Sequence, residues 1–416
     1  MSQLALVQPF QGWRPLREHV SRVAAPPYDV LNSDEARAMA EDNPYSFLRV
    51  SKAEINLPVG TSPYDAAVYQ KAAENFAALK QQGILVQDPQ PCYYVYRLIM
   101  DGRAQTGVVA AASVQAYDSD RIKKHEFTRP DKENDRTEFA WQLKAHSGPV
   151  FLTYRHNVRI DNLVNKVCAG EPIYDFTAPD GIQHTLWVSA DAADNQQITE
   201  AFDALAHVYV ADGHHRSAAA SRVHRRFVEE GLGRDDEEAP HNRFLSVLFP
   251  DNQMRILDYN RVVKDLGGLS RAAFLERLGE AFEITPQRVP CTPNQRRTFG
   301  MYLEGVWYKL VLKAEIADPE DPTKRLDVSL LSDHLLAPIL GIEDLRRDAR
   351  IDFVGGIRGM AGLMARVDSG EMAVAFSMCA TTMDDLMAVA DDGQVMPPKS
   401  TWFEPKLRDG LVTQGF

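Results

Sequence analysis

The stretch VADGHHRSAAA, from Val210 to Ala220, decides how the middle of the chain folds. It opens with apolar residues that favour a strand, continues with the turn dipeptide Asp212-Gly213, and ends in alanines that favour a helix. The stretch therefore predicts a strand, a sharp turn and a helix in direct succession. Two histidines, an arginine and a serine then lie at the N-terminus of that helix.

This predicted turn has the chemistry of a phosphate site. Gly213 permits a sharp bend, so the amides of residues 213–217 point to one place together with the positive end of the helix dipole. Arg216 adds a guanidinium that binds an oxyanion through two hydrogen bonds, and Ser217 adds a hydroxyl. We therefore predict that a phosphate binds at this turn.

The other polar residues of the turn leave alternatives open. His214 and His215 can donate to phosphate oxygens or protonate them, and Asp212 can cap the helix or orient His214. Aspartate and histidine are also metal ligands, although adjacent histidines need help from other segments to hold one ion. A third interpretation is a capped helix whose polar side chains are only solvated.

A second polar cluster, IKKHEFTRP, lies upstream at residues 122–130. Its apolar lead ends in His125 and Glu126, and a helix is predicted over residues 131–144. We expect both side chains at the mouth of a strand-loop-helix unit, where the Glu126 carboxylate can act as general base on a substrate hydroxyl. A charged surface loop is the alternative interpretation. Basic residues near the cluster would attract an anion, namely Lys123, Lys124, Arg129 and Arg136.

Length and composition indicate an ordinary globular protein of more than one domain. The chain has 416 residues, of which 44% are hydrophobic and 25% charged, so we expect two or three domains. Its formal net charge of −12 disfavours nucleic acid as a partner. The N-terminus has no signal-peptide pattern and no apolar run is long enough to span a membrane, so we expect a cytoplasmic location. The four cysteines form no CxxC pair and are expected to be small buried hydrophobes.

The order of the elements predicts an α+β fold in three regions. Residues 1–90 contain a proline-rich loop, a helix start predicted at Asn32 and a helix predicted over residues 62–82. Residues 91–250 contain both polar clusters, and a helix predicted over residues 217–230 is followed by a charged loop over residues 229–241. Residues 251–416 alternate strands with helices predicted over residues 271–282, 329–340 and 383–390, and end in the tail KSTWFEPKL. In the second region, CYYVYRLIM and TGVVAAASV flank Asp101-Gly102 and predict a hairpin.

Three further segments are candidates to complete a pocket around the turn. AAPPYDVL places Tyr28 and Asp29 on a loop stiffened by prolines, and NPYSFLRV places Arg49 at the end of a predicted strand. These three residues are predicted to contact substrate, with a rigid turn or a surface ion pair as the alternatives. The tail KSTWFEPKL either folds back over the site or packs through Trp402 and Phe403.

The two polar clusters resemble the signature segments of the ParB/sulfiredoxin-like superfamily, in particular those of the free-serine kinases, over about residues 90–250. The whole chain resembles a large family of mostly uncharacterised bacterial and archaeal proteins of this length. That second resemblance also includes AAPPYDVL, NPYSFLRV and MPPKSTWFEPKL. The resemblance implies a ParB/sulfiredoxin-like nucleotide-binding core between a helical N-terminal region and an α+β C-terminal region.

The kinase resemblance also implies a reaction. It makes Glu126, next to His125, the base that deprotonates the acceptor, and it makes residues 212–216 the turn that binds the nucleotide phosphates. The implied donor is ATP or ADP with Mg²⁺, which Asp212 helps to retain, and the implied acceptor is L-serine or a similar hydroxylated metabolite. A sulfiredoxin activity is excluded because no cysteine lies near the turn.

One departure from the kinase pattern keeps other functions open. His215 stands at a position where the kinases can have threonine, so both the nucleotide and the reaction can differ. A nucleotide-binding sensor would keep the phosphate turn without transferring a phosphoryl group. A metal-dependent phosphohydrolase would instead use His214 and His215 to hold a metal ion.

Overall fold

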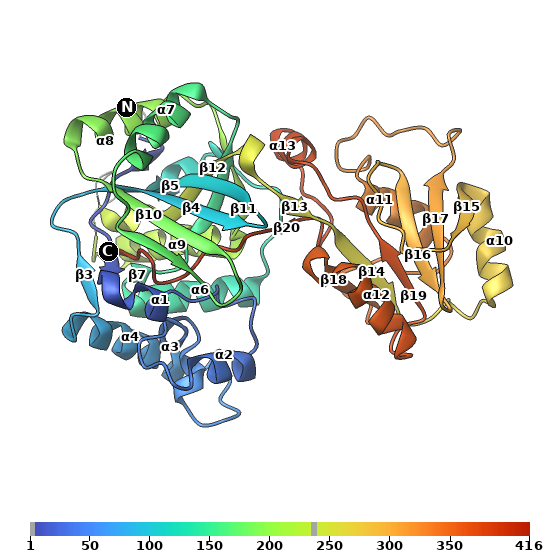
Figure 1. Ribbon diagram of the computed structural model, residues 1–416, viewed down its shortest axis with the longest axis horizontal. Helices are drawn as coiled ribbons and strands as arrows, with labels where there is room; N and C mark the ends of the chain where they lie inside the picture. Colours follow the sequence, from blue (N-terminus) through green and yellow to red (C-terminus); the bar gives the residue numbers. More distant parts are fainter. Residues whose placement is uncertain (1–4, 234–238) are drawn as a thin grey trace. The chain divides into compact units, whose positions relative to one another are not determined.

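The computed structural model describes residues 5–233 and 239–416. Their contacts divide the chain into two compact units, one of residues up to 254 with residues 405–416, the other of residues 255–404. Both units combine helices with sheets, which confirms the predicted α+β class (Figure 1). The predicted division of the chain into three regions, with boundaries at residues 90 and 250, stays a prediction.

A mixed sheet organises the first unit. Its strand order is β6-β11-β8-β12-β5-β4-β10-β9, and β1 pairs with β5. Neighbouring strands are antiparallel, except that β11 runs parallel to β6 and β12 runs parallel to β8. The strands are β1 (Val7–Gln8), β4 (Tyr93–Met100), β5 (Arg103–Ser113), β6 (Ile122–Lys123), β8 (Val150–Tyr154), β9 (Tyr174–Thr177), β10 (Gln183–Ser189), β11 (Val208–Asp212) and β12 (Arg243–Pro250).

The predicted hairpin is confirmed as β4 and β5. Asp101 and Gly102 join the strands with φ angles of 53° and 74°. Two successive positive φ angles are what a two-residue hairpin turn needs to match the twist of its strands, and glycine adopts them without steric cost. The turn fixes the register from Met100 opposite Arg103 onward.

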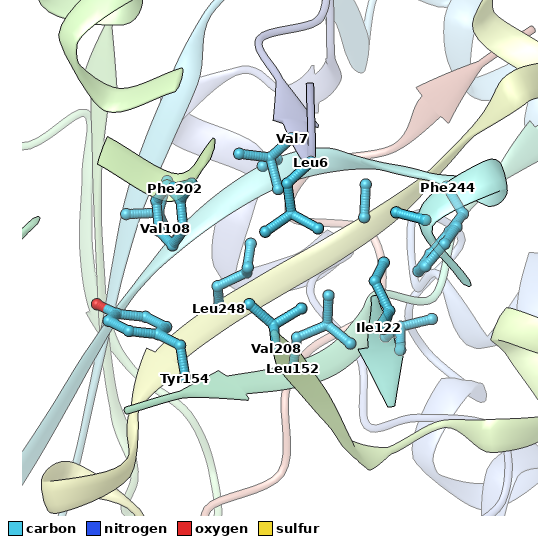
Figure 2. Close-up of a cluster of buried hydrophobic side chains, with 14 of the residues drawn as sticks. Leu6, Val7, Val108, Ile122, Leu152, Tyr154, Phe202, Val208, Phe244 and Leu248 are labelled. Carbon is cyan, nitrogen blue, oxygen red and sulfur yellow. The ribbon is translucent and has the colours of Figure 1, made fainter. Parts of the chain in front are cut away.

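Apolar side chains from the sheet and from its covering helices form one core cluster of this unit (Figure 2). Leu152 and Leu248 come from adjacent parallel strands, and Phe202 comes from α8. All three are completely or almost completely buried, and each such side chain contributes about 1.5–3 kcal/mol relative to an exposed one. The helices that contribute to this cluster include α5 (Val114–Asp118), α7 (Val158–Cys168) and α8 (Ala192–Asp203).

Helices near the N-terminus form a second apolar cluster with α6 (Pro130–Leu143). The side chain of Asn32 and that of Glu35 cap the start of α2 reciprocally, which confirms the helix start predicted there. Asp65 caps α4, so the helix predicted from residue 62 begins at Ala66 instead. The helices are α1 (Val20–Val23), α2 (Ser33–Ala40), α3 (Leu48–Ser51) and α4 (Ala66–Gln81), and the hairpin beside them pairs β2 (Trp13–Pro15) with β3 (Leu85–Gln87).

The strand predicted in NPYSFLRV is wrong, because Leu48–Ser51 is the helical turn α3. The amides of Arg49 and Val50 donate to carbonyls three residues earlier, and the apolar side chains are buried against α4. A short apolar run is compatible with either a strand or a buried helical turn, and here tertiary packing selects the helix. No helix in residues 5–233 and 239–416 is long and apolar enough to cross a bilayer.

Helices α6 (Pro130–Leu143) and α9 (His214–Glu229) pack against each other and carry the two polar clusters at their N-termini. The helix predicted over residues 131–144 is thereby confirmed. The helix predicted from Ser217 begins three residues earlier, directly after the turn. The charged loop predicted over residues 229–241 lies partly outside the described residues.

The second unit contains an antiparallel sheet of order β15-β17-β16-β19-β14-β18. Its strands are β14 (Tyr259–Val263), β15 (Phe282–Gln287), β16 (Thr298–Leu303), β17 (Val306–Leu312), β18 (Ile351–Gly355) and β19 (Val374–Ser377), and β13 (Ile256–Leu257) pairs with β20 (Trp402–Phe403). Its helices are α10 (Arg271–Ala281), α11 (Asp327–Leu331), α12 (Gly359–Asp368) and α13 (Met383–Asp391). The helices predicted near residues 271, 329 and 383 are therefore present, although α11 continues as a π-helical turn over Ser332–Leu336.

Candidate functional site

The turn between β11 and α9 is as tight as its sequence predicts. Gly213 is the N-cap of α9 and has φ 97° and ψ 28°, a left-handed conformation that favours glycine. The amides of Arg216 and Ser217 both donate to the Gly213 carbonyl, at 2.9 and 3.0 Å. The amides of His214 and His215 precede these bonds, at the end of the helix where backbone N–H groups point outward.

Asp212 does not cap the helix, because α9 has no side-chain cap. Instead, Asp212 Oδ2 accepts a hydrogen bond from Lys406 Nζ at 2.9 Å. Burial alone would raise the pKa of Asp212, but the positive charges of Lys406 and Arg216 outweigh it and lower the pKa. The turn therefore carries an ionised carboxylate at neutral pH.

The loop that follows β6 meets this turn. Ile122 of β6 lies opposite Val208 of β11 in a parallel pair, so both strands end at the same edge of the sheet. The amide of His125 lies 3.5 Å from His214 Nε2, and the two rings are perpendicular with centroids 4.5 Å apart. Glu126 Oε2 lies 3.8 Å from His214 Nδ1. The two polar clusters predicted separately are thus brought together.

The two histidines at this junction are buried and uncharged. Burial lowers the pKa of His125 to about 4. Burial also lowers the pKa of His214, and the neighbouring His125 adds to this effect. The His125 ring contacts the Val210 backbone, and neither of its nitrogens forms a hydrogen bond of good geometry within the described residues. Glu126, in contrast, has 45% of its side chain exposed and faces solvent as well as His214.

His215 is turned toward the start of α6. Its Nε2 accepts a hydrogen bond from the amide of Arg129 at 3.1 Å, and burial lowers its pKa. The Arg129 guanidinium is mostly exposed and pairs with Asp131 at 2.8 Å. The structure thus groups His214 with His125 and Glu126 rather than with its neighbour His215.

Arg216 and Ser217 support the turn from inside. The Arg216 guanidinium lies beside the Gly213 Cα and donates to the Pro149 carbonyl. Burial alone would lower the pKa of Arg216, but Asp29 and Asp212 outweigh it and raise the pKa. Ser217 is fully buried, and its hydroxyl donates to the His214 carbonyl at 3.1 Å. This hydroxyl therefore stabilises the first turn of α9.

Of the other predicted residues, Tyr28 and Arg136 are adjacent to each other and Arg49 is elsewhere. The Arg136 guanidinium lies 3.9 Å from the centre of the Tyr28 ring and pairs with Asp135 at 2.9 Å. Arg49 donates to the carbonyls of Ala40 and Asn43, at 2.6 and 3.0 Å, and so ties together the N-terminal helices. The structure does not bring Arg49 to the turn.

Comparison with protein families gives one match. Residues 7–329 match the family described as "Protein of unknown function (DUF1015)", which is well over half of the chain. The chain belongs to the DUF1015 family. This confirms the predicted membership of a full-length family of this kind. No curated protein matches this DUF1015 chain.

Several solved structures are similar to this DUF1015 protein at low identity. A variant of free serine kinase in complex with AMP is 16% identical with a TM-score of 0.34, over 71% of this chain and 87% of that one. A conserved hypothetical protein from Pyrococcus furiosus is 15% identical with a TM-score of 0.33, over 73% and 93% of the two chains. SbnI with C-terminal truncation from Staphylococcus aureus is 10% identical with a TM-score of 0.37, over 72% and 85%. Likenesses this weak assign no role to any residue of the DUF1015 chain.

Two residues on the C-terminal segment of this DUF1015 protein belong to the surroundings of the turn. One is Lys406 of the tail KSTWFEPKL, which pairs with Asp212, so this part of the tail reaches the turn, as one of the two interpretations of the tail expected. The other is Asp409, which forms two backbone hydrogen bonds with Ala25 at 2.9 and 3.1 Å, next to the proline-rich loop. Burial raises the pKa of Asp409 to about 7, and its Oδ1 has no hydrogen-bond partner within the described residues.

Asp409 faces a small cavity beside Arg216. The cavity has a volume of about 30 Å³, which is room for water molecules but not for a nucleotide. The residues that line it include Tyr28, Arg136, His146, Arg216 and Asp409. Residues from the N-terminal region, from α6 and α9, and from the C-terminal segment therefore meet at this cavity.

Proposed function

We propose that this protein transfers a phosphoryl group from ATP or ADP to the hydroxyl of free serine or of a similar small metabolite. The observation that carries the proposal is the approach of Glu126 to the N-terminus of α9, where Glu126 Oε2 lies 3.8 Å from His214 Nδ1. A carboxylate beside a phosphate-binding turn provides the two parts that such a transfer requires, a base for the acceptor and a cradle for the donor. A ParB/sulfiredoxin-like core is part of the same proposal.

The turn would hold the donor phosphates. The first-turn amides of α9, at His214 and His215, carry the positive end of the helix dipole toward the ligand. The half-buried guanidinium of Arg216 lies beside Gly213. In this proposal Gly213 is needed so that the backbone can approach the phosphate closely, and Ser217 keeps the turn in shape.

Glu126 would act as the base. In the transfer, the acceptor hydroxyl gives its proton to the Glu126 carboxylate while its oxygen bonds to the terminal phosphorus. The bond from that phosphorus to the bridging oxygen breaks, and ADP leaves from ATP, or AMP from ADP. Glu126 is suited to this role because it is partly exposed and can reach an acceptor that arrives from solvent.

Asp212 supplies the oxygen ligand that Mg²⁺ prefers. Its carboxylate is ionised, and Oδ2 accepts the hydrogen bond from Lys406, so Oδ1 is the oxygen that would retain the ion. Bound Mg²⁺ would neutralise charge on the donor phosphates. Asp29 adds a second negative charge near Arg216, and together with Tyr28, Arg129 and Arg136 it is the proposed contact for the acceptor.

The test is ³¹P NMR of the full chain with Mg²⁺, ATP or ADP, and L-serine. The proposal expects a new phosphomonoester resonance that depends on the acceptor. In Glu126→Gln the rate should fall by a factor of about 100 or more, while nucleotide affinity changes by less than about threefold. Glu138→Gln is the matched control, because Glu138 has 44% of its side chain exposed, close to the 45% of Glu126, and lies outside the turn.

Two other outcomes would replace the proposal. Nucleotide binding with no acceptor-dependent product would indicate a sensor. Release of free phosphate without any acceptor would indicate a phosphohydrolase. Full activity in Glu126→Gln would remove the base from the mechanism.

A further inference from the structure

We propose that His125, Glu126 and His214 form a binding site for a divalent transition-metal ion of the Zn²⁺ class. Each residue offers one ligand atom, and these atoms all lie within 4.8 Å of one another. Two come from the loop after β6 and one from the first turn of α9, which the parallel pairing of β6 with β11 brings to one edge of the sheet. The inference concerns ion binding and does not rest on the proposed phosphoryl transfer.

The separations are close to those that one ion requires. Bonds from Zn²⁺ to nitrogen or oxygen are about 2.0–2.2 Å, so two ligand atoms on one ion lie at most about 4.4 Å apart. The 3.8 Å between Glu126 Oε2 and His214 Nδ1 is already within that limit. A separation of up to 4.8 Å within the cluster is slightly larger, so a small movement of the side chains would complete the site.

His125 gives an independent reason to expect a ligand. It has 1% exposure, and apart from a contact with the Val210 backbone neither of its ring nitrogens forms a hydrogen bond of good geometry within the described residues. Buried polar groups are nearly always hydrogen-bonded or bound to an ion, because leaving them unpaired costs free energy. An ion between His125 and His214 would satisfy one of these nitrogens.

The donor set selects the class of ion. Two imidazoles with one carboxylate suit Zn²⁺ and similar transition-metal ions, whereas Mg²⁺ prefers oxygen ligands throughout. Both imidazoles are buried, and the neutral form of the ring is the one that binds metals. His214 would bind through Nδ1, which faces Glu126, and its ring proton would move to Nε2. That move gives up only the contact with the His125 amide, which at 3.5 Å is already long for a hydrogen bond.

An ion at this place would occupy the carboxylate that the proposed transfer uses as its base. Ion binding and base catalysis by Glu126 therefore exclude each other in one molecule at one time. The two proposals are consequently tested with different readouts, and ion binding is measured without nucleotide or acceptor.

The experiment is metal titration of the full chain after dialysis against EDTA. Zn²⁺ binding is followed by isothermal titration calorimetry and by elemental analysis of the washed protein, and Co²⁺ is added as a spectroscopic probe of the ligand geometry. The proposal expects one Zn²⁺ per chain and a visible Co²⁺ absorption typical of four ligands. In His125→Ala and in Glu126→Gln, affinity should fall about tenfold or more.

His156→Ala is the matched control. His156 Nε2 lies 2.6 Å from Asp161 Oδ2, so it forms another histidine–carboxylate contact, but on the surface and away from the cluster. This variant should retain one Zn²⁺. Glu126→Gln keeps the test decisive if His125→Ala fails to fold, because Glu126 is partly exposed. Absence of stoichiometric Zn²⁺ in the wild type, or an unchanged affinity in Glu126→Gln, would overturn the metal site without affecting the kinase test.

Discussion

Lys406 Nζ lies 2.9 Å from Asp212 Oδ2, although 194 positions separate the two residues in the chain. The contact ties the C-terminal segment to the turn that begins α9. It also explains why the Asp212 carboxylate stays ionised in spite of its burial, since the charge of Lys406 acts against the effect of desolvation. The end of the chain is therefore part of the candidate site.

The first prediction removes this contact. Lys406→Met should lower the free energy of unfolding by about 1–2 kcal/mol, because it leaves Asp212 as a half-buried carboxylate without this partner. Urea denaturation measures the change. The double variant with Asp212→Asn should lose less than the sum of the two single variants, since each change removes the same interaction. Strict additivity would show that the two side chains do not interact.

The second prediction concerns the backbone of the turn. Gly213→Ala places a Cβ at a φ of 97° and only 3.2 Å from Arg216 Nε, so both strain and crowding are expected. The free energy of unfolding should fall by about 1–2 kcal/mol or more. Gly60→Ala is the control, because Gly60 has a similar φ of 91° but has nothing within 4 Å of the added Cβ.

Comparing these variants separates the two effects. The loss shared by Gly60→Ala and Gly213→Ala measures conformational strain, and any further loss in Gly213→Ala measures crowding against Arg216. Only Gly213→Ala should weaken binding of inorganic phosphate or nucleotide, measured by calorimetry. Equal phosphate binding in wild type and Gly213→Ala would remove the turn from the binding site.

The sequence predicted those features that local chemistry determines. The hairpin at Asp101-Gly102 and the turn at Gly213 follow from the conformational freedom of glycine, which depends on no distant residue. The strand predicted at Arg49 is wrong for the opposite reason, because a short apolar run carries no local signal that separates a strand from a buried helical turn.

The assembly of the site depended on long-range pairing, which no local pattern encodes. His125 and His214 were each predicted to lie at the end of a strand, but the parallel register between β6 and β11 decides that these ends meet. Lys406 lies in a nonhelical segment among prolines, where its charge has no periodic context. Only the folded chain shows that it is opposite Asp212.

The third prediction uses the raised pKa of Asp409. Burial shifts this pKa from 3.8 to about 7, against the opposing charge of Arg216 and in the same direction as the nearby Asp29. The folded state therefore binds the proton more tightly than the unfolded state, so this residue reduces stability as pH rises from about 4 to about 7. The melting temperature of Asp409→Asn, relative to that of the wild type, should be several degrees higher at pH 8 than at pH 5. A difference independent of pH would contradict the assignment.

The last prediction concerns His146, which lines the same cavity and has the opposite dependence on pH. Burial lowers its pKa from 6.5 to about 3, and its Nε2 has no hydrogen-bond partner within the described residues. Because the unfolded state takes up the proton more readily, His146 contributes stability that is complete above pH 6.5 and is lost as pH falls toward 3. His146→Gln cannot titrate in this range, so its melting temperature should decline less steeply than that of the wild type between pH 6.5 and pH 4. Its own cost at neutral pH should be modest, because glutamine is polar and of similar size. Parallel declines in the two proteins would show that another buried group, such as His125, determines the loss of stability at acidic pH.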